Sequence, residues 1–187
     1  QKKRIRKLTL LSISVLFAYI SAVLKKEGFD SVEELYVNIE GGNNISMAKT
    51  TGLSIFEFTN TFQRIKPEMV IVAGDRFEVL AAATAAAYMN IVVVHIEGGD
   101  VSGTIDESVR HAVTKLSHIH FAASKKSAER IVKMGEEPWR VHIVGAPGLD
   151  AILHDDFYDE KTIKEKYSLL SGNYIVLVQH PVSTESS

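Results

Sequence analysis

Residues 69–99 have the sequence MVIVAGDRFEVLAAATAAAYMNIVVVHIEGG, and this stretch decides the predicted fold. Residues 69–73 and 91–96 are apolar runs without alternation, which is typical of strands buried on both faces of a parallel sheet. The Ala-rich residues 77–89 between them favour a helix. A strand, a helix and a second strand in this order predict a parallel sheet covered by helices.

The same alternation continues on both sides of this stretch. Upstream, residues 47–65 have apolar side chains at helical spacing, and the helix is expected to end at Lys66-Pro67, because proline pushes the preceding residue out of the helical region. Downstream, the pattern predicts helix 106–118, strand 120–123, helix 125–134, strand 141–144 and strand 174–178. The chain is therefore predicted to be an α/β domain with a doubly wound parallel sheet.

The composition fits one such domain and excludes several other classes of protein. The 187 residues are 45% hydrophobic and include no cysteine, which excludes a disulfide-stapled domain and a zinc site or nucleophile based on cysteine. The net charge of −2 lacks the basic excess of nucleic-acid-binding proteins. No H-x-x-x-H pair is present, and we expect no metal ion and no cofactor.

The first fifty residues contain a pattern that resembles a targeting segment. Five basic residues precede an uncharged run at 8–24. The run is shorter than the roughly 20 apolar residues that span a bilayer, and no small-residue cleavage signal follows it. We therefore expect either a buried helix or strand–helix pair, or a join between pieces whose intervening loops are missing, and no contact with a membrane.

Charged side chains follow the predicted strands. Asp75 and Arg76 follow the first buried strand, His95 and Glu97 lie at the end of the second, and His180 follows the last. The carboxyl ends of parallel strands meet at one edge of the sheet, where α/β proteins bind their ligands. We therefore expect these side chains to line a cleft.

The helix predicted to open at Asp106 adds further charges to this edge. Asp106 and Arg110 are four residues apart and share a helix face, as do Glu107 and His111. Carboxylates crowded into a cleft raise one another's pKa, so that some can be protonated while others stay ionised. Such a site suits a reaction in which a proton is removed at one place and delivered at another.

Each of these residues also has an ordinary structural interpretation. Asp75 could cap the following helix, and Gly98-Gly99 could form only a turn. An Asp106–Arg110 pair on the surface would stabilise the fold by only a few tenths of a kcal/mol. Three carboxylates and a histidine at one sheet edge favour the functional interpretation. No Walker A loop, nucleophile elbow or G-x-G-x-x-G motif is present, so phosphate binding would depend on Arg, Lys or helix N-termini.

Residues 47–187 resemble the UDP-N-acetylglucosamine 2-epimerases, and specifically the hydrolysing branch that makes N-acetylmannosamine for sialic acid synthesis. The resemblance rests on RIKP at 64–67, VAGDRF at 72–77, HIEGGDVSGTIDESVRH at 95–111, GAP at 145–147 and QHP at 179–181. The third of these is the most specific. The non-hydrolysing branch typically has alanine where Gly98 stands, so the Gly-Gly-x-Val-Ser-Gly pattern favours the hydrolysing branch.

The resemblance implies a fold, a reaction and a set of site residues. Two Rossmann-like domains in the B-type glycosyltransferase arrangement close over a UDP-sugar, UDP is eliminated to give 2-acetamidoglucal, and water adds to yield N-acetylmannosamine. The implied catalytic residues are Asp75, Glu97, Asp106 and His180. The implied substrate-binding residues are Arg76, Gly98, Gly99, Ser102 and Arg110. His180 is expected to stabilise the departing phosphate, and Arg110 to pair with Asp106. The resemblance does not decide which carboxylate is the acid and which the base.

The resemblance also implies a division of the chain and a cellular setting. Residues 1–178 are expected to form the N-terminal Rossmann-like domain, with interruptions in 1–46, and residues 179–187 to begin a hinge to a second domain. The family's Gly-Thr-Arg-Ala-Asp loop and C-terminal domain have no match here. Family members are usually dimers or tetramers, so the resemblance implies a homodimer or homotetramer that acts on a UDP-sugar. The near-neutral charge and the lack of cysteine fit a cytoplasmic enzyme, and we expect neither nucleic acid nor a membrane as a partner. The alternatives are a related UDP-2,4-diacetamido-trideoxyhexose as substrate, a non-catalytic nucleotide-sugar-binding module and a B-type glycosyltransferase.

Overall fold

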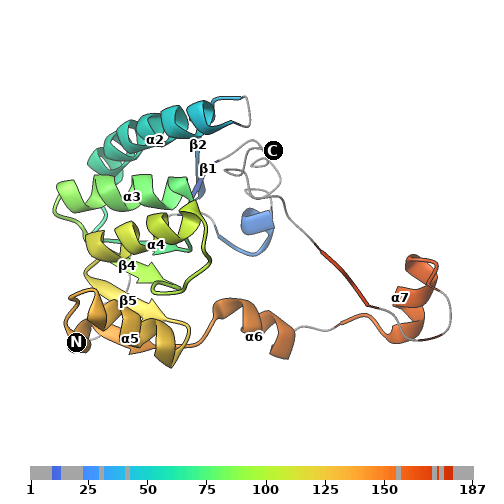
Figure 1. Ribbon diagram of the computed structural model, residues 1–187. Helices are drawn as coiled ribbons and strands as arrows, with labels where there is room; N and C mark the ends of the chain where they lie inside the picture. The colour runs from blue at the N-terminus through green and yellow to red at the C-terminus, as the bar shows by residue number, and fades with distance from the viewer. Residues whose placement is uncertain are drawn as a thin grey trace.

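A four-stranded parallel sheet with the order β3–β4–β5–β6 forms the centre of the computed structural model (Figure 1). The structure describes residues 10–13, 23–29, 32–40, 43–154, 157–169, 172 and 175–178. The strands are β3 (Met69–Ala73), β4 (Val92–Ile96), β5 (Ile119–Ala122) and β6 (Val141–Ile143). In the register of the sheet, His95 lies between Val72 on β3 and His120 on β5.

Helices connect the consecutive strands of this sheet. They are α3 (Phe77–Tyr88), α4 (Ile105–Leu116) and α5 (Lys125–Lys133). Right-handed crossovers that advance steadily in one direction return over the same face of a sheet, so these helices form one layer, as Figure 1 shows. Helix α2 (Asn44–Ile65) packs against α3. The remaining helical elements are η1 (Pro138–Arg140), α6 (Pro147–His154) and α7 (Glu160–Lys166).

Small side chains allow α3 to pack closely against its neighbours. Ala81, Ala83 and Ala86 are completely buried, and they share the main core with Phe62 of α2 and Val113 of α4. Alanine is the strongest helix former and loses no side-chain entropy on burial. An Ala-rich helix can therefore lie between two other helices and still approach the sheet.

Local signals set both ends of α2. The Asn43 side chain accepts a hydrogen bond from the Ser46 backbone N–H at 2.9 Å, and the Ser46 hydroxyl accepts one from the Asn43 N–H at 3.1 Å. This capping box starts the helix three residues before the predicted position 47. The helix ends where predicted, with Lys66 in the left-handed conformation before Pro67.

The predicted α/β class with a parallel sheet is confirmed, and the predicted elements between residues 47 and 144 are present. The predicted strand at 174–178 is wrong. Residues 175–178 belong to no strand, and Ile175 and Leu177 are 94% and 87% exposed. An apolar run favours an extended backbone, but a strand also needs a neighbour for its hydrogen bonds, and this segment lies away from the sheet (Figure 1).

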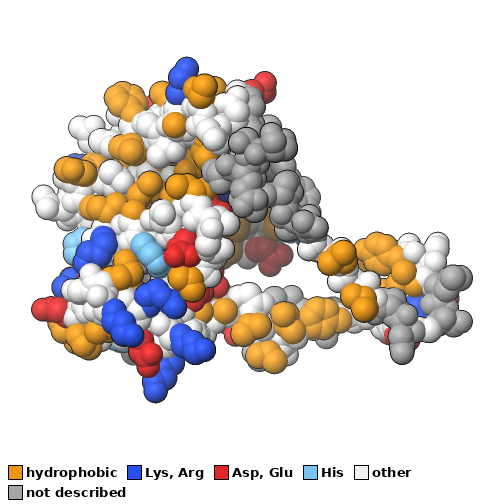
Figure 2. Space-filling model, viewed as in Figure 1, with side chains coloured by type: hydrophobic (Ala, Val, Ile, Leu, Met, Phe, Trp, Pro, Cys, Tyr) orange, Lys and Arg blue, Asp and Glu red, His pale blue; other side chains and the backbone are white. Residues whose placement is uncertain are grey.

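Helix α6 also leads away from the sheet and exposes apolar side chains (Figure 2). Leu149, Ile152 and Leu153 are each more than half exposed. An exposed apolar strip of this kind is unusual on the surface of a folded domain, where such patches commonly mark a contact with another surface.

A small second sheet pairs β1 (Leu10–Ile13) with β2 (Val32–Leu35) in parallel. Strand β1 lies within the uncharged run at 8–24, of which residues 8–9 and 14–22 are outside the described part of the chain. Among the described residues, no helix is both long enough and apolar enough to cross a membrane.

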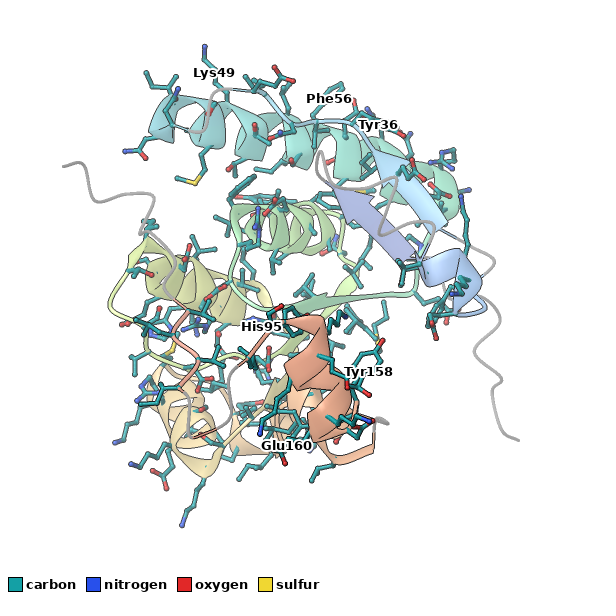
Figure 3. All side chains as sticks on the ribbon, turned by 90° about the vertical axis from the view of Figure 1, so that its right-hand side faces the viewer. Tyr36, Lys49, Phe56, His95, Tyr158 and Glu160 are labelled. Carbon is teal, nitrogen blue, oxygen red and sulfur yellow. The ribbon has the colours of Figure 1, made fainter. Side chains whose placement is uncertain are left out.

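Replacing Phe62 tests the assigned buried face of α2. Phe62 is 1% exposed and stacks on Phe58 with ring centroids 5.5 Å apart. We expect Phe62→Ala to lower the free energy of unfolding by about 3–5 kcal/mol, because the lost ring leaves a cavity. Phe56, which is 64% exposed on the same helix (Figure 3), is the matched control. In urea unfolding, Phe56→Ala should change stability by roughly 0.5 kcal/mol or less. Equal effects would show that the buried face is misassigned.

Candidate active site

The candidate site lies where β3 and β4 end and α4 begins. Asp75 follows β3 after a turn at Gly74, whose φ is +82°. The Gly74 N–H donates to the carbonyl of Ile96 on β4 at 3.2 Å, so the two strand ends are joined. Strand pairing and this bond bring the segments that carry Asp75 and Glu97 to one edge of the sheet.

An inward-facing ion pair connects this edge to α4. The Arg110 guanidinium binds the Asp75 carboxylate, and it also donates to the Asp100 carbonyl oxygen at 2.9 Å. Both side chains of the pair are largely withdrawn from solvent. The predicted pairing of Arg110 with Asp106 is therefore wrong. Arg110 turns toward the sheet, where screening by water is weaker, whereas Asp106 stays exposed on the first turn of α4.

Arg76 lies beside these groups but is itself exposed. Its guanidinium donates to both carboxylate oxygens of Glu78, at 3.1 and 2.9 Å. Glu78, followed by Asp106 and Asp75, raises the pKa of Arg76 through attraction of its positive charge. The residue at the N-cap of α3 is Arg76, and no side chain caps this end of the helix with a hydrogen bond. The interpretation of Asp75 as a helix cap is therefore wrong.

The backbone after β4 packs so closely against neighbouring residues that Gly98 and Gly99 have no room for a side chain. A Cβ atom on Gly98 would lie 2.8 Å from Nδ1 of His95, and one on Gly99 would clash with the backbone carbonyl oxygen of Ser127. Glu97 itself has a φ of +64°, a conformation that non-glycine residues rarely adopt and that often occurs at functional sites. The Gly98-Gly99 pair thus forms more than a turn, because close packing at this edge of the sheet requires glycine at both positions.

Glu107 holds the loop between Gly99 and α4. Its carboxylate accepts hydrogen bonds from the backbone N–H groups of Ser102 and Gly103, at 2.8 and 2.7 Å. These two donors lower the pKa of Glu107. The predicted Glu107–His111 neighbour pair is present, with 3.9 Å between the carboxylate oxygen of Glu107 and Nε2 of His111. Ser102 is exposed on this loop, and its hydroxyl lies 3.4 Å from that of Thr104.

Helix α5 supports the loop from the other side, which the sequence did not predict. Arg130 donates to the Gly99 carbonyl oxygen, and the Ser127 hydroxyl donates to the Asp100 carboxylate. Nothing in the local sequence identifies these residues, because their partners lie about thirty positions earlier in the chain.

The sequence placed His95 at the end of β4 but did not identify its hydrogen-bond partners. It is completely buried (Figure 3), and its Nε2–H donates to the Gly74 carbonyl oxygen at 3.0 Å. Its Nδ1 lies 3.3 Å from the Thr114 hydroxyl of α4. Burial lowers the pKa of His95 to about 4, so the imidazole is neutral at physiological pH.

A small apolar pocket adjoins Asp106. It has a volume of about 170 Å³ and lies between the first turns of α2, α3 and α4, with Met47, Leu80 and Val109 among its lining residues. Asp106 is the one charged residue of its described lining. Whole-ligand pockets usually measure roughly 300–1,000 Å³, so this one is sized for a single substituent.

The structure brings some of the predicted residues together and leaves others apart. Asp75 is ion-paired with Arg110, and the charges of Asp75 and Asp106 both act on Arg76. Within the described part of the chain, Glu97 makes no side-chain hydrogen bond or ion pair. His180 lies outside the described residues. No group of three or more His, Asp or Glu side chains among the described residues is placed to hold a metal ion.

Comparison with known proteins identifies the family. The family model for UDP-N-acetylglucosamine 2-epimerase matches residues 18–187. The chain belongs to the UDP-N-acetylglucosamine 2-epimerase family. A UDP-N,N'-diacetylbacillosamine 2-epimerase (hydrolyzing) from Legionella pneumophila is 39% identical over 183 residues, which are 94% of this chain and 48% of the relative. A UDP-N-acetylglucosamine 2-epimerase from Neisseria meningitidis serogroup B is 41% identical over 140 residues, which are 75% and 37% of the two chains.

Solved structures of the family show the same fold. The crystal structure of UDP-GlcNAc 2-epimerase from Neisseria meningitidis bound to UDP-GlcNAc aligns with a TM-score of 0.66 at 25% identity, over 86% of this chain and 42% of that one. The likeness confirms the prediction of a Rossmann-like α/β unit from a B-type glycosyltransferase architecture. The chain spans about half the length, or less, of the epimerases that it matches.

The low pKa of His95 predicts a pH dependence of stability. The unfolded chain holds histidine with a pKa near 6.5, so between this value and about 4 it binds more protons than the folded chain, and stability falls as the pH falls. We expect His95 to contribute a loss of about 2 kcal/mol between pH 6.5 and 4.5.

Urea unfolding across this pH range measures the effect. His120, whose pKa is also lowered by burial, contributes in the same direction, so the comparison is between the unmodified protein and His95→Gln. The variant should show the flatter dependence on pH. Parallel curves would contradict a buried neutral imidazole at position 95.

Proposed function

We propose that this chain provides the catalytic carboxylates of a hydrolysing UDP-N-acetylglucosamine 2-epimerase, which converts UDP-GlcNAc and water to N-acetylmannosamine and UDP. The observation that carries the proposal is the Arg110–Asp75 ion pair at the sheet edge, with Asp106 beside it, in a member of the epimerase family. Carboxylates gathered at the ligand-binding edge of a parallel sheet can act as the base and the acid of such a reaction.

The proposed reaction has two stages. A carboxylate removes the C2 proton of the sugar, the C1–O bond breaks with its electron pair passing to the UDP β-phosphate, and a C1–C2 double bond forms. Water then adds its hydroxyl to C1 and gives its other proton to a carboxylate, while a carboxylic acid returns a proton to C2 from the opposite face. The acid and base roles are shared among Asp75, Glu97 and Asp106, and His180 stabilises the departing phosphate.

The substrate-binding part of the proposal rests on exposed and backbone groups. The exposed Arg76 supplies positive charge for phosphate, and Ser102 supplies an exposed hydroxyl. Arg110 borders the same cleft and acts there through its ion pair with Asp75. Gly98 and Gly99 let the backbone of this edge approach its partners closely. The apolar pocket beside Asp106 has room for the methyl group of the 2-acetamido substituent.

We also propose that residues 1–178 form the N-terminal domain of a two-domain cytoplasmic enzyme, that residues 179–187 begin the hinge, and that the enzyme is a homodimer or homotetramer. The apolar strip exposed on α6 supports a further contact surface.

A second substrate deserves a direct test because of one relative. The Legionella protein that is 39% identical over 94% of this chain is named for UDP-N,N'-diacetylbacillosamine. With the complete gene product, we expect kcat/KM for UDP-GlcNAc to exceed that for UDP-2,4-diacetamido-trideoxyhexose. The reverse ratio would establish the diacetamido sugar as the substrate.

Turnover in heavy water tests the reaction itself. Free N-acetylmannosamine with deuterium at C2, together with UDP, is the expected product, because the proton at C2 comes from solvent. UDP-N-acetylmannosamine would indicate the non-hydrolysing reaction, and free N-acetylglucosamine without deuterium would indicate simple hydrolysis. No conversion of either UDP-sugar would leave a nucleotide-sugar-binding module, which binding of UDP-GlcNAc by calorimetry would then identify.

Substitution of Asp75 tests the catalytic assignment. We expect Asp75→Asn to lower kcat/KM by a factor of about 10²–10⁴, because the amide cannot take or give a proton. Glu68→Gln, at an exposed position just before β3 and away from the candidate site, is the control and should retain full activity. Since the change also breaks the pair with Arg110, Arg110→Gln is measured alongside it. Full activity of a folded Asp75→Asn protein would refute the role of Asp75.

A further inference from the structure

One buried imidazole contacts the segments that carry the proposed catalytic groups. His95 belongs to β4, two residues before Glu97, and its side chain is completely withdrawn from solvent. One ring nitrogen contacts the turn that leads to Asp75, and the other contacts α4, which carries Arg110. The ring is therefore placed to set the positions of these segments relative to one another.

The first contact holds the turn before Asp75. The Gly74 carbonyl oxygen accepts from Nε2–H of His95 at 3.0 Å, and the Gly74 N–H donates to the Ile96 carbonyl at 3.2 Å. Both polar groups of the Gly74 backbone are thus bound to β4. The next residue is Asp75, so the direction in which its carboxylate leaves the sheet follows from these two bonds.

The second contact reaches the backbone of Arg110. The Thr114 hydroxyl donates to the Arg110 carbonyl oxygen at 3.0 Å, and it lies 3.3 Å from Nδ1 of His95, so its single proton is shared between these two acceptors. Gly98 packs directly on the ring, since an added Cβ would lie 2.8 Å from Nδ1. Displacement of the ring would therefore disturb the helix turn of Arg110 and the strand end beside Glu97.

We propose that His95 is a positioning residue, whose imidazole links the Gly74 turn to Thr114 of α4 and so holds the Asp75 carboxylate against Arg110. The catalytic consequence rests on the function proposed above, whereas the linkage itself does not. The ring stays neutral at physiological pH, which preserves one donor and one acceptor for its two partners.

His120 provides a matched comparison within the same sheet. It is also completely buried and lies directly opposite His95 in the β4–β5 register. Its Nε2 lies 3.3 Å from the Glu136 carboxylate, which also binds Lys115, and none of these groups belongs to the candidate site. A buried histidine that serves only stability should behave as His120 does.

Kinetics of the complete gene product on its UDP-sugar test the proposal. We expect His95→Leu to lower kcat on the order of 100-fold, as small displacements of catalytic groups do, with KM within about threefold of the unmodified value. His95→Gln should recover much of this loss, because its amide can donate to Gly74 and accept from Thr114. His120→Leu should leave kcat of the folded protein within about threefold.

Amide hydrogen exchange provides a readout that does not depend on activity. In His95→Leu, exchange should rise in peptides that cover residues 74–77 and 106–114, and in His120→Leu it should rise around residues 115–120 and 134–137 instead. Thr114→Val, a smaller change, should raise exchange in the first two peptides to a lesser extent.

The outcomes separate the two proposals. Unchanged exchange at residues 74–77 in His95→Leu overturns the linkage, whatever the activity. Increased exchange there with unchanged kcat overturns the positioning role in catalysis. An unmodified protein without turnover of any UDP-sugar refutes the proposed function, and the exchange result then still decides whether His95 links the two segments.

Discussion

The parallel pairing of β3 with β4 is the constraint on which both the fold and the candidate site depend. It sets Val72 opposite His95 and Ala73 opposite Ile96, so both strands end at the same level. The Gly74 turn and the Glu97 turn therefore leave the sheet next to each other, and the bond from Gly74 to Ile96 fastens them. Only in this arrangement does Asp75 come within reach of an arginine that lies 35 residues later in the chain.

Asp75, Asp106 and Glu107 lie on or near α4, but each makes different interactions because its surroundings differ. Asp75 is drawn against Arg110 away from solvent, whereas Glu107 accepts two backbone N–H groups and so holds the adjacent loop. Asp106 remains exposed at the first turn of α4, where the helix dipole favours a carboxylate, and it borders the apolar pocket. Similar side chains can thus serve ion pairing, loop structure and ligand contact within one short stretch.

Sequence patterns predicted the sheet because β3 and β4 are largely apolar runs that end in glycine or charge, and these signals are local. The partner of Arg110 was mispredicted because helical spacing identifies only neighbours on the same helix, and Asp75 comes from another element. Residues 174–178 have the composition of a strand, but a strand forms only where another strand can share its backbone hydrogen bonds, and composition does not show whether one is present. The role of His95 was partly accessible: a polar residue inside a buried apolar run must have a hydrogen-bond partner, although its identity depends on packing.

The steady winding of the sheet has a consequence for how the chain folds during synthesis. The strands begin at residues 69, 92, 119 and 141, and each pairs with the one before it. Each strand can therefore pair with one that the ribosome has already delivered, in the order of synthesis. The pair between Asp75 and Arg110 closes within this unit, so the centre of the candidate site can assemble on the nascent chain before α6 and α7 have been translated.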